Sequence, residues 1–292
     1  MPYGMIVKGR GGFYTVLNEE GESLVLRPQK KLKKQAGSLL IGDRVQYEML
    51  DEGQGWIVSV LDRKNSFIRP PVANIELMII VLAKLPQPDF MLVDKLLVFC
   101  FMNDIEPLIV INKDDLGDEA YRSALCYEKA CENILSVSTV ENNGLDELKK
   151  LMKGRLACFA GQSGVGKSSI IRAITGNSDI FVGSLSEKIE RGKQTTRHAS
   201  IFIHDNLMLM DTPGFSLLEL PRALEPEKLR DFYPEFDELA CLCRFSPCLH
   251  DREPDCAVKK AVDEGKISKE RHLRYTQLLQ DVKNAWRERY DG

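Results

Sequence analysis

Hydrophobic residues follow three different patterns along this chain of 292 residues. Residues 1–66 hold short segments in which apolar and polar side chains alternate, with glycine-rich turns between them. Residues 67–220 alternate continuous apolar runs with stretches of helical periodicity, and residues 221–292 are mainly helical and charged. Alternation is typical of strands, whereas apolar runs between helices are typical of α/β sheets. We therefore predict a multidomain fold in which these three regions are the domains.

The alternating N-terminal segments predict a small β-barrel. Each segment is short and bounded by turn residues, as expected for one strand of a closed antiparallel sheet. Five such strands favour an oligonucleotide-binding (OB-like) barrel. The expected strands are residues 4–8, 13–17, 23–27, 44–49 and 56–61.

Basic and aromatic residues of this barrel are candidates for nucleic-acid binding. The segment 28–34 carries four lysines, and Phe13, Tyr14, Tyr47 and Trp56 lie on the expected strands. Bases stack on aromatic rings beside a positive surface, so these residues can form a single-strand binding face. The alternative is that the rings fill the barrel core and the lysines lie on a solvated loop.

The central pattern predicts an α/β domain with a mostly parallel sheet. Residues 65–73, which contain two consecutive prolines, are expected to form the linker into it. The loops that follow parallel strands meet at one edge of the sheet, where ligands bind. Strands are expected from residue 75, then at residues 107–111, 134–135, 156–160 and 206–210. Helices are expected at residues 90–102, 119–131, 145–152 and 167–174.

A phosphate-binding loop lies between the expected strand 156–160 and the expected helix 167–174. It fits the pattern G-x-x-x-x-G-K-[ST] in the strand–loop–helix context that the pattern requires. Glycines let backbone N–H groups wrap phosphates, Lys167 is expected to reach the β- and γ-phosphates, and the Ser168 hydroxyl is expected to bind Mg²⁺. The motif predicts a nucleoside triphosphate without choosing its base. Its residues are Gly161, Gln162, Ser163, Gly164, Val165, Gly166, Lys167 and Ser168, followed by Ser169.

The base is indicated by Asn112, Lys113, Asp114 and Asp115, which follow the expected strand 107–111. A carboxylate such as that of Asp115 accepts from both N1–H and N2–H₂ of guanine, a pair of donors that adenine lacks. An isolated motif of this kind is often only a polar turn, but its presence beside a phosphate loop favours a guanine site. Ser138 is also expected to belong to the loop that closes over the base.

A third motif, Asp211-Thr-Pro-Gly214, follows the expected strand 206–210. Asp211 is placed to hold a Mg²⁺-bound water, and the Gly214 N–H is placed to sense the γ-phosphate. Between this motif and the phosphate loop, either Thr195 or Thr196 is a candidate Mg²⁺ ligand. An ordinary surface loop is the alternative for that threonine segment.

The residue after Gly214 is Phe215, where many regulatory GTPases carry a glutamine that orients the attacking water. We therefore expect slow intrinsic hydrolysis unless the water is oriented from elsewhere. Gln194, next to the two threonines, is the nearest candidate.

The order of these motifs is rotated. Ordinary GTPases begin with the phosphate loop and end with the base-reading motif, whereas here the base motif comes first. All the functional loops of a doubly wound sheet project from one edge, so the site survives a circular permutation of the chain. The permutation connects the Asp211 motif to the C-terminal region.

That region contains Cys243, Cys248, His250 and Cys256 within a short polar stretch. Three thiolates and one imidazole can form a closed tetrahedral Zn²⁺ site with a structural role. Cys241 competes with Cys243 for the fourth ligand position, and the alternative to a metal site is that the cysteines only pack. Helices are expected at residues 227–231, 255–264 and 269–290, and the last either packs over this module or contacts a partner.

Composition favours a cytoplasmic protein without a membrane segment. The remaining cysteines lack the spacing of a disulfide framework, and no leader or long apolar run is present. The net charge of −3 excludes a globally basic nucleic-acid binder but allows a local basic surface.

Together, these features resemble the circularly permuted, ribosome-small-subunit-dependent GTPase A family. The resemblance runs nearly end to end and includes residues 69–74, 191–196 and 256–262. It implies a monomeric, late-acting assembly factor that binds GTP/GDP with Mg²⁺, the small (30S) ribosomal subunit and its rRNA near the decoding region. It also implies that subunit-stimulated hydrolysis is coupled to release of the factor and of other assembly factors.

One position departs from this family. The family often has a histidine directly before the paired threonines, and this chain has Gln194. Glutamine can orient water by hydrogen bonding but cannot carry a proton as imidazole does. Two other functions remain open at this stage: a switch GTPase that acts on a protein partner, and an RNA-binding module with a GTP-sensing pocket.

Overall fold

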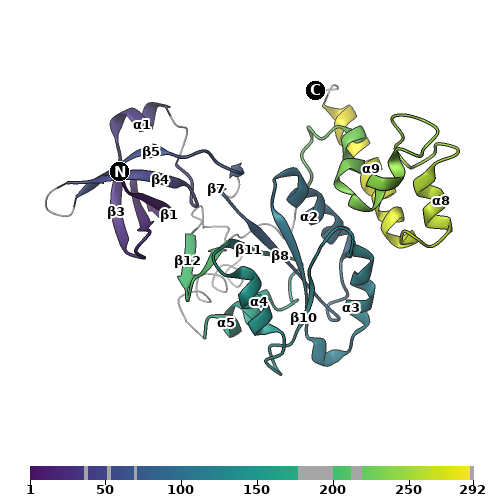
Figure 1. The fold of residues 1–292 in the computed structure, drawn as a ribbon, viewed down its shortest axis with the longest axis horizontal. Coiled ribbons are helices and arrows are strands. Elements are labelled where there is room, and N and C mark those ends of the chain that lie inside the picture. Colours follow the sequence, from purple (N-terminus) through teal and green to yellow (C-terminus); the bar gives the residue numbers. More distant parts are fainter. Residues whose placement is uncertain (36–38, 51–53, 69–70, 177–199, 212–218, 290–292) are drawn as a thin grey trace.

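The computed structural model describes residues 1–35, 39–50, 54–68, 71–176, 200–211 and 219–289. It has an N-terminal barrel, a central α/β domain and a C-terminal helical module (Figure 1). The barrel and the helical module lie on opposite sides of the α/β domain in this view. No helix among the described residues is long and apolar enough to cross a membrane.

The N-terminal part is a closed five-stranded barrel, which confirms the predicted fold. Four of its strand pairs are antiparallel, and only β3 and β5 run parallel. The strand order is β1-β2-β3-β5-β4. Its elements are β1 (Tyr3–Arg10), β2 (Phe13–Asn18), β3 (Ser23–Pro28), α1 (Lys30–Gln35), β4 (Arg44–Met49) and β5 (Gly55–Val60).

The aromatic residues of the barrel divide between its core and its surface. Tyr47 is only 4% exposed and packs with the buried aliphatic side chains, as the core alternative expected. Phe13 is 41% exposed, and the Arg27 guanidinium lies 4.1 Å from the centroid of its ring. Of these two rings, therefore, only that of Phe13 lies on the surface of the barrel.

Within the expected linker, β6 (Ser66–Ile68) and β7 (Pro71–Ala73) pair as the antiparallel strands of a hairpin. Hydrogen bonds from the two asparagines that flank it tie the barrel to the central domain. Asn74 donates from Nδ2 to the carbonyl of Gly42 in the barrel at 2.9 Å. Asn65 exchanges two hydrogen bonds with the backbone of Ile75, at 2.9 and 3.0 Å. Both carboxamides are buried, so the junction is a packed part of the structure.

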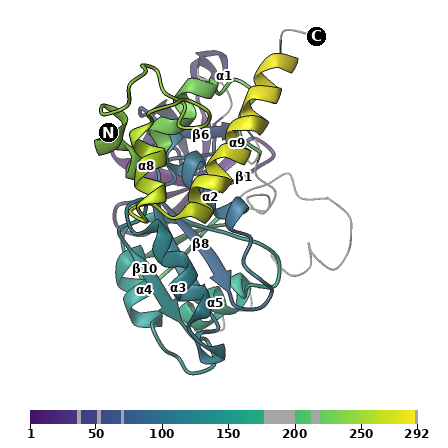
Figure 2. The same cartoon turned by 90° about the vertical axis from the view of Figure 1, so that its right-hand side faces the viewer.

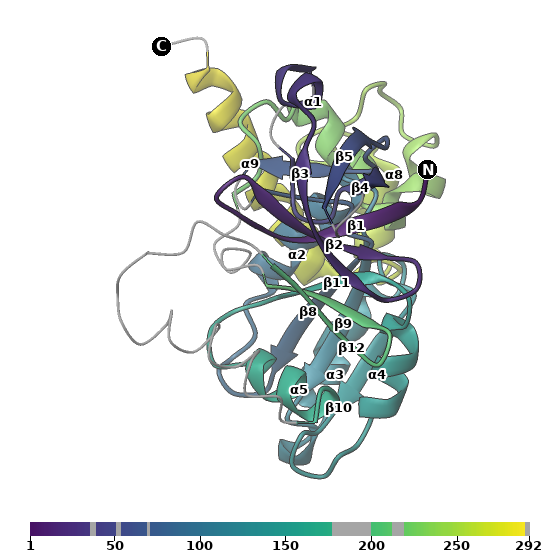
Figure 3. The same ribbon diagram turned by 90° about the vertical axis from the view of Figure 1, so that its left-hand side faces the viewer.

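The central sheet has six strands in the order β10-β9-β8-β11-β13-β12. The first five are parallel, and β12 pairs antiparallel with β13 at the edge. β12, which the sequence did not predict, packs beside β1 of the barrel (Figure 3). The strands are β8 (Leu77–Ala83), β9 (Glu106–Asn112), β10 (Ile134–Val137), β11 (Leu156–Ala160), β12 (Ser200–His204) and β13 (Leu207–Asp211).

Helices cover both faces of this sheet. Apolar residues of α2 (Phe90–Met102) and α3 (Glu119–Ala124) pack on one face. Those of α4 (Leu145–Met152) and α5 (Lys167–Ile174) pack on the other. The helix expected to reach residue 131 ends at Ala124 and continues as a short 3-10 turn (Leu125–Tyr127).

The C-terminal module has its own apolar core, built around aromatic rings and α9 (Lys269–Glu288). Figure 2 shows α9 as a long helix beside α8 and α2. It therefore packs over the module, which was one of the two expectations for this helix. The other elements are η4 (Pro226–Phe232), η5 (Pro234–Phe236), α7 (Asp237–Ala240) and α8 (Ala257–Asp263).

Candidate nucleotide and metal sites

The fold brings the base motif and the phosphate loop to one edge of the sheet. Asn112 is the last residue of β9, and Ala160 is the last residue of β11. Both strands run parallel to β8, which lies between them. Loops that leave the carboxyl ends of such neighbouring strands form the usual ligand crevice of a doubly wound sheet.

Two glycines of the phosphate loop occupy positions that no other residue can take. Gly161 has φ +124°, and a Cβ there would lie 2.3 Å from the carbonyl oxygen of Val81. Gly166 has φ +93°, and its Cβ would lie 2.2 Å from Nδ2 of Asn112. Glycine removes both the clash and the left-handed strain. The loop can therefore pack closely against β8 and the base motif.

Lys167, the first residue of α5, bends back over the loop. Its Nζ donates to the carbonyls of Gly161 and Gln162 at 2.6 and 2.7 Å. Partial burial lowers the pKa of its ammonium group. Ser168 and Ser169 follow in the first turn of α5, where the N-terminal N–H groups of a helix favour an anion. The ammonium group of Lys167 and the N-terminus of α5 therefore both lie at the phosphate loop.

Side chains of the base motif hold the phosphate loop directly. The buried Asn112 donates from Nδ2 to the carbonyl of Val165 at 2.9 Å. Lys113 has φ +62° and donates from Nζ to the carbonyls of Gly164 and Leu85, at 2.9 and 2.6 Å. The two motifs, which are far apart in sequence, therefore form one structural unit.

The acidic pair of the base motif is oriented by two serines, one near the end of β10 and one directly after it. The Ser138 hydroxyl donates to Oδ1 of Asp115, and the Ser136 hydroxyl donates to Oδ1 of Asp114, both at 2.7 Å. A held carboxylate loses less freedom when it accepts from a base. Ser138 thus lies beside Asp115, the acid expected to read guanine.

The metal-ligand candidates also come together. The ligand atoms of Cys243, Cys248, His250 and Cys256 all lie within 4.8 Å of one another. Nδ1 of His250 is 3.6 Å from Sγ of Cys243 and 3.4 Å from Sγ of Cys256, and the two sulfurs are 3.9 Å apart. A tetrahedron around zinc with Zn–S bonds of about 2.3 Å has S–S edges of about 3.8 Å. These residues therefore fit a zinc ion.

Cys241 does not join this cluster. It is exposed, and its Sγ lies 3.6 Å from the carbonyl of Glu238. The geometry thus favours Cys243 over Cys241 as the fourth member, the choice that the sequence left open. Burial lowers the pKa of His250 to about 4, so its imidazole is neutral at pH 7, as a metal ligand must be. Burial raises the pKa of Cys248 to about 12, so a cation is needed to stabilise its thiolate.

A family model described as RsgA GTPase matches residues 60–221, and one described as RsgA N-terminal domain matches residues 3–57. The chain belongs to the RsgA GTPase family. It is 41% identical to a protein of Caldanaerobacter subterraneus over 98% of both chains, and 40% identical to one of Ruminiclostridium cellulolyticum over 97% of this chain and 95% of that one. Both relatives are named small ribosomal subunit biogenesis GTPase RsgA.

Solved structures extend this similarity to the whole fold. YjeQ from Thermotoga maritima has a TM-score of 0.83 and 34% identity, covering 96% of this chain and 98% of its own. YloQ, described as a circularly permuted GTPase, has a TM-score of 0.83 and 30% identity, covering 97% of this chain and 96% of its own. The similarity to these two solved structures therefore includes the C-terminal module, and it agrees with the rotated order of the motifs.

Four predicted site residues of this RsgA-family chain, Gln194, Thr195, Thr196 and Gly214, lie outside the described residues. Asp211 is the last residue of β13, which runs parallel to the strand that leads into the phosphate loop. Its backbone thus lies at the expected edge, and its side chain is outside the described part.

Sequence reasoning missed residues 85–89, which lie along the phosphate loop. Gln162 hydrogen-bonds through its side chain with the backbone of Gln87 and Asp89. The only signal in the sequence was a pair of prolines, at 86 and 88, directly after a buried strand. Such a pair marks a turn but does not show what the turn contacts.

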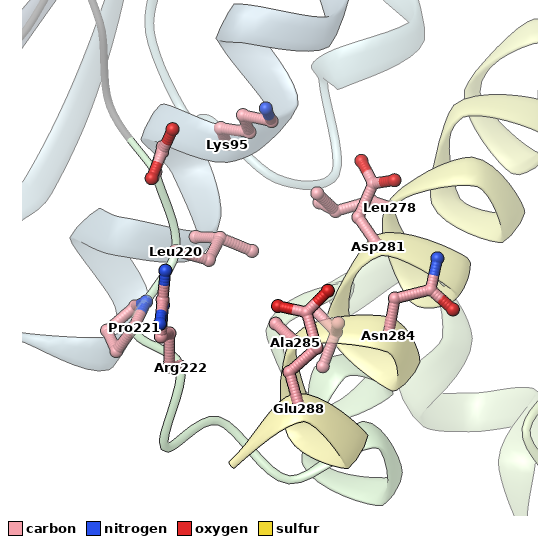
Figure 4. A pocket seen from close by; sticks show the side chains of 11 residues that line it. Lys95, Leu220, Pro221, Arg222, Leu278, Asp281, Asn284, Ala285 and Glu288 are labelled. Carbon is pink, nitrogen blue, oxygen red and sulfur yellow. The ribbon is translucent and has the colours of Figure 1, made fainter. Parts of the chain in front are cut away.

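The chain re-enters the described region at residue 219, next to the C-terminal module. Figure 4 shows Leu220, Pro221 and Arg222 on the same side of the pocket as Lys95 of α2, facing the residues of α9 across it. The pocket has a volume of about 310 Å³ and is lined on α9 by residues such as Asp281. Residues 219–222 of this RsgA-family chain therefore line a pocket together with α2 of the central domain and α9 of the C-terminal module.

Proposed function

We propose that this chain is a GTPase that binds the small (30S) ribosomal subunit and assists its late maturation. One observation carries the GTPase part: the guanine motif is bonded to the phosphate loop through Asn112 and Lys113. The ribosomal part is supported by full-length similarity to relatives named small ribosomal subunit biogenesis GTPases.

In this proposal, the guanine base is held by Asn112, Lys113, Asp114, Asp115 and Ser138. Asp115 accepts from N1–H and N2–H₂, while Ser138 keeps its carboxylate in place. The phosphates accept hydrogen bonds from the backbone N–H groups of residues 161–169. The ammonium group of Lys167 leaves the loop carbonyls and donates instead to the β- and γ-phosphate oxygens.

Mg²⁺ would be held by Ser168, by Thr195 or Thr196, and through water by Asp211. When bound, it neutralises charge on the β- and γ-phosphates. The Ser168 hydroxyl at the start of α5 and the end of β13 at the same sheet edge fit this role. Gln194 orients the attacking water and Gly214 senses the γ-phosphate. Hydrolysis without the subunit is slow, because Phe215 stands where many regulatory GTPases carry the glutamine that orients the water.

The flanking parts bind rRNA in this proposal. The barrel (residues 1–66) and the C-terminal module (residues 221–292) lie on either side of the GTPase domain (residues 67–220) and contact the subunit together. Zn²⁺ on Cys243, Cys248, His250 and Cys256 has a structural role. The protein acts as a cytoplasmic monomer, and hydrolysis releases it together with other assembly factors.

The decisive experiment measures steady-state GTP hydrolysis by the purified protein alone, with small ribosomal subunits, and with large subunits or bulk RNA as controls. A strong stimulation by small subunits only is the expected result. Stimulation by no ribosomal component, with intact GTP binding, would favour a switch GTPase with a protein partner. Salt-sensitive RNA binding without turnover would favour an RNA-binding module with a GTP-sensing pocket.

A further inference from the structure

Gln162, the second residue of the phosphate loop, uses its side chain to hold the segment that leads into α2. Its Oε1 accepts from the backbone N–H of Asp89 at 2.8 Å, and its Nε2 donates to the carbonyl of Gln87 at 3.0 Å. Phosphate loops bind anions through backbone N–H groups, which any side chain at this position would leave available. The carboxamide therefore serves to connect two segments of chain.

The segment that Gln162 holds is fixed at both ends. At one end, Oδ1 of Asp89 accepts from the N–H of Leu92 at 2.9 Å and so caps α2. At the other end, Lys113 donates both to the carbonyl of Leu85 and to that of Gly164 in the phosphate loop. Residues 85–89 thus run along the phosphate loop between two anchors.

The helix behind this segment is a rigid support. Asp94, within the first two turns of α2, is buried and pairs with Arg271 and Arg274 of α9. A side chain positions its neighbours only as well as its own anchor is held. Gln162 therefore ties the start of the phosphate loop to a helix that is fixed from its far side.

We propose that Gln162 is a positioning residue of the nucleotide site, which keeps the phosphate loop in its phosphate-binding shape before the nucleotide arrives. This inference rests on the proposed GTPase function. The ammonium of Lys167 hydrogen-bonds with the carbonyls of Gly161 and Gln162 and draws them toward the centre of the loop. The carboxamide of Gln162 holds the same residue toward α2. Without this carboxamide, the loop samples more conformations. Part of the free energy of nucleotide binding is then used to order the loop, and the affinity falls.

The test compares Gln162→Ala with Gln87→Ala in the full-length, zinc-loaded protein. Each variant loses one glutamine carboxamide. Gln87 takes part in the contact with Gln162 only through its backbone carbonyl, which alanine keeps, and the side chain of Gln87 is exposed. We expect Gln162→Ala to raise KM for GTP and Kd for fluorescently labelled GDP by about tenfold, the size of one or two lost hydrogen bonds. At saturating GTP, kcat should change by less than about twofold, because bound phosphates order the loop. Gln87→Ala should match the unmodified protein.

An unchanged KM in Gln162→Ala, or an equal rise in Gln87→Ala, would overturn the inference. A lower kcat with unchanged KM would also overturn it, because this indicates a smaller folded fraction. If Gln162→Ala does not fold, Gln162→Met keeps the chain length without the hydrogen bonds and should show the same rise in KM. A failure of the proposed function itself would be visible in the unmodified protein, as absent GDP binding and absent hydrolysis with small subunits.

Discussion

The guanidinium of Arg271 on α9 donates to the carboxylate of Asp94 on α2, and both side chains are almost completely buried. Arg271 also pairs with Glu235 and lies between two aromatic rings, 4.6 Å from the centroids of Tyr127 and Tyr233. Two carboxylates and the faces of two aromatic rings therefore compensate the positive charge of Arg271. This contact fixes the C-terminal module to the central domain.

Replacing Arg271 by Met should strongly destabilise the protein. Methionine fills similar space but leaves the carboxylates of Asp94 and Glu235 with one partner fewer, and an uncompensated buried charge costs about 3–5 kcal/mol. The free energy of unfolding in urea measures the loss. The control is Arg122→Met, which breaks a solvent-exposed pair with Asp118 and should leave the free energy of unfolding almost unchanged. An equal loss of unfolding free energy in the two variants would show that the buried cluster stabilises the protein no more than the exposed pair does.

Gly42 should tolerate alanine much less well than Gly21, although both have positive φ, at +92° and +83°. Alanine in this conformation costs about 1–2 kcal/mol at either position. At Gly42, the added Cβ would also lie 2.1 Å from the carbonyl oxygen of Ala73, whereas nothing lies within 4 Å at Gly21. We expect Gly42→Ala to lower the free energy of unfolding by at least about 3 kcal/mol, because the hairpin must also shift. Similar losses in both variants would argue against a tight junction.

Cys248→Ser should lose the bound zinc, whereas Cys241→Ser should keep it. Both changes replace one thiol by a hydroxyl, but only Cys248 belongs to the four-ligand cluster. Atomic emission on the purified proteins should give about one zinc per chain for Cys241→Ser and close to none for Cys248→Ser. The loss should also loosen the C-terminal module, which limited proteolysis detects. Full zinc content in Cys248→Ser would refute the ligand set.

Asp115→Asn should exchange guanine specificity for xanthine specificity. An asparagine amide offers one donor and one acceptor, which suit the C2 carbonyl and the N1–H of xanthine, whereas the carboxylate suits the two donors of guanine. We expect GDP affinity to fall at least about a hundredfold and xanthosine diphosphate to bind in its place. Competition against a labelled nucleotide measures both.

The control for this change is Asp118→Asn, which alters an exposed aspartate that pairs with Arg122 away from the motif. It should leave both affinities unchanged. If Asp115→Asn kept its preference for GDP, the assignment of this carboxylate to the base would be wrong.

Much of the site could be predicted from the sequence because its residues act through local geometry. The glycines at 161 and 166 are required by their positive φ and by the close approach of the backbone to its neighbours. Helices such as α2 and α4 were predicted with the bounds that the structure shows, because residues next to their ends mark where they begin, such as Asp89, which caps α2.

Features that depend on distant partners could not be predicted. The strands β6 and β7 were interpreted from the sequence as part of a proline-rich linker. Their place in the fold depends on the hydrogen bond from Asn74 to Gly42, and Gly42 lies far away in the sequence. The helix expected to reach residue 131 ends early, where Tyr127 turns inward to meet Arg271 and Arg274 of α9. Choosing between Cys241 and Cys243 likewise required the fold, since only one of the two sulfurs faces His250.

The paired asparagines around the hairpin also decide how the protein can be divided in the laboratory. A fragment that ends at residue 66 keeps Asn65 but loses the backbone of Ile75, and a fragment that starts at residue 67 keeps Asn74 but loses Gly42. Each piece would expose a carboxamide and an apolar surface that the intact chain covers. Binding studies on an isolated barrel or an isolated GTPase domain would then measure the behaviour of a damaged surface, so contacts with RNA are better mapped by point substitutions in the intact chain.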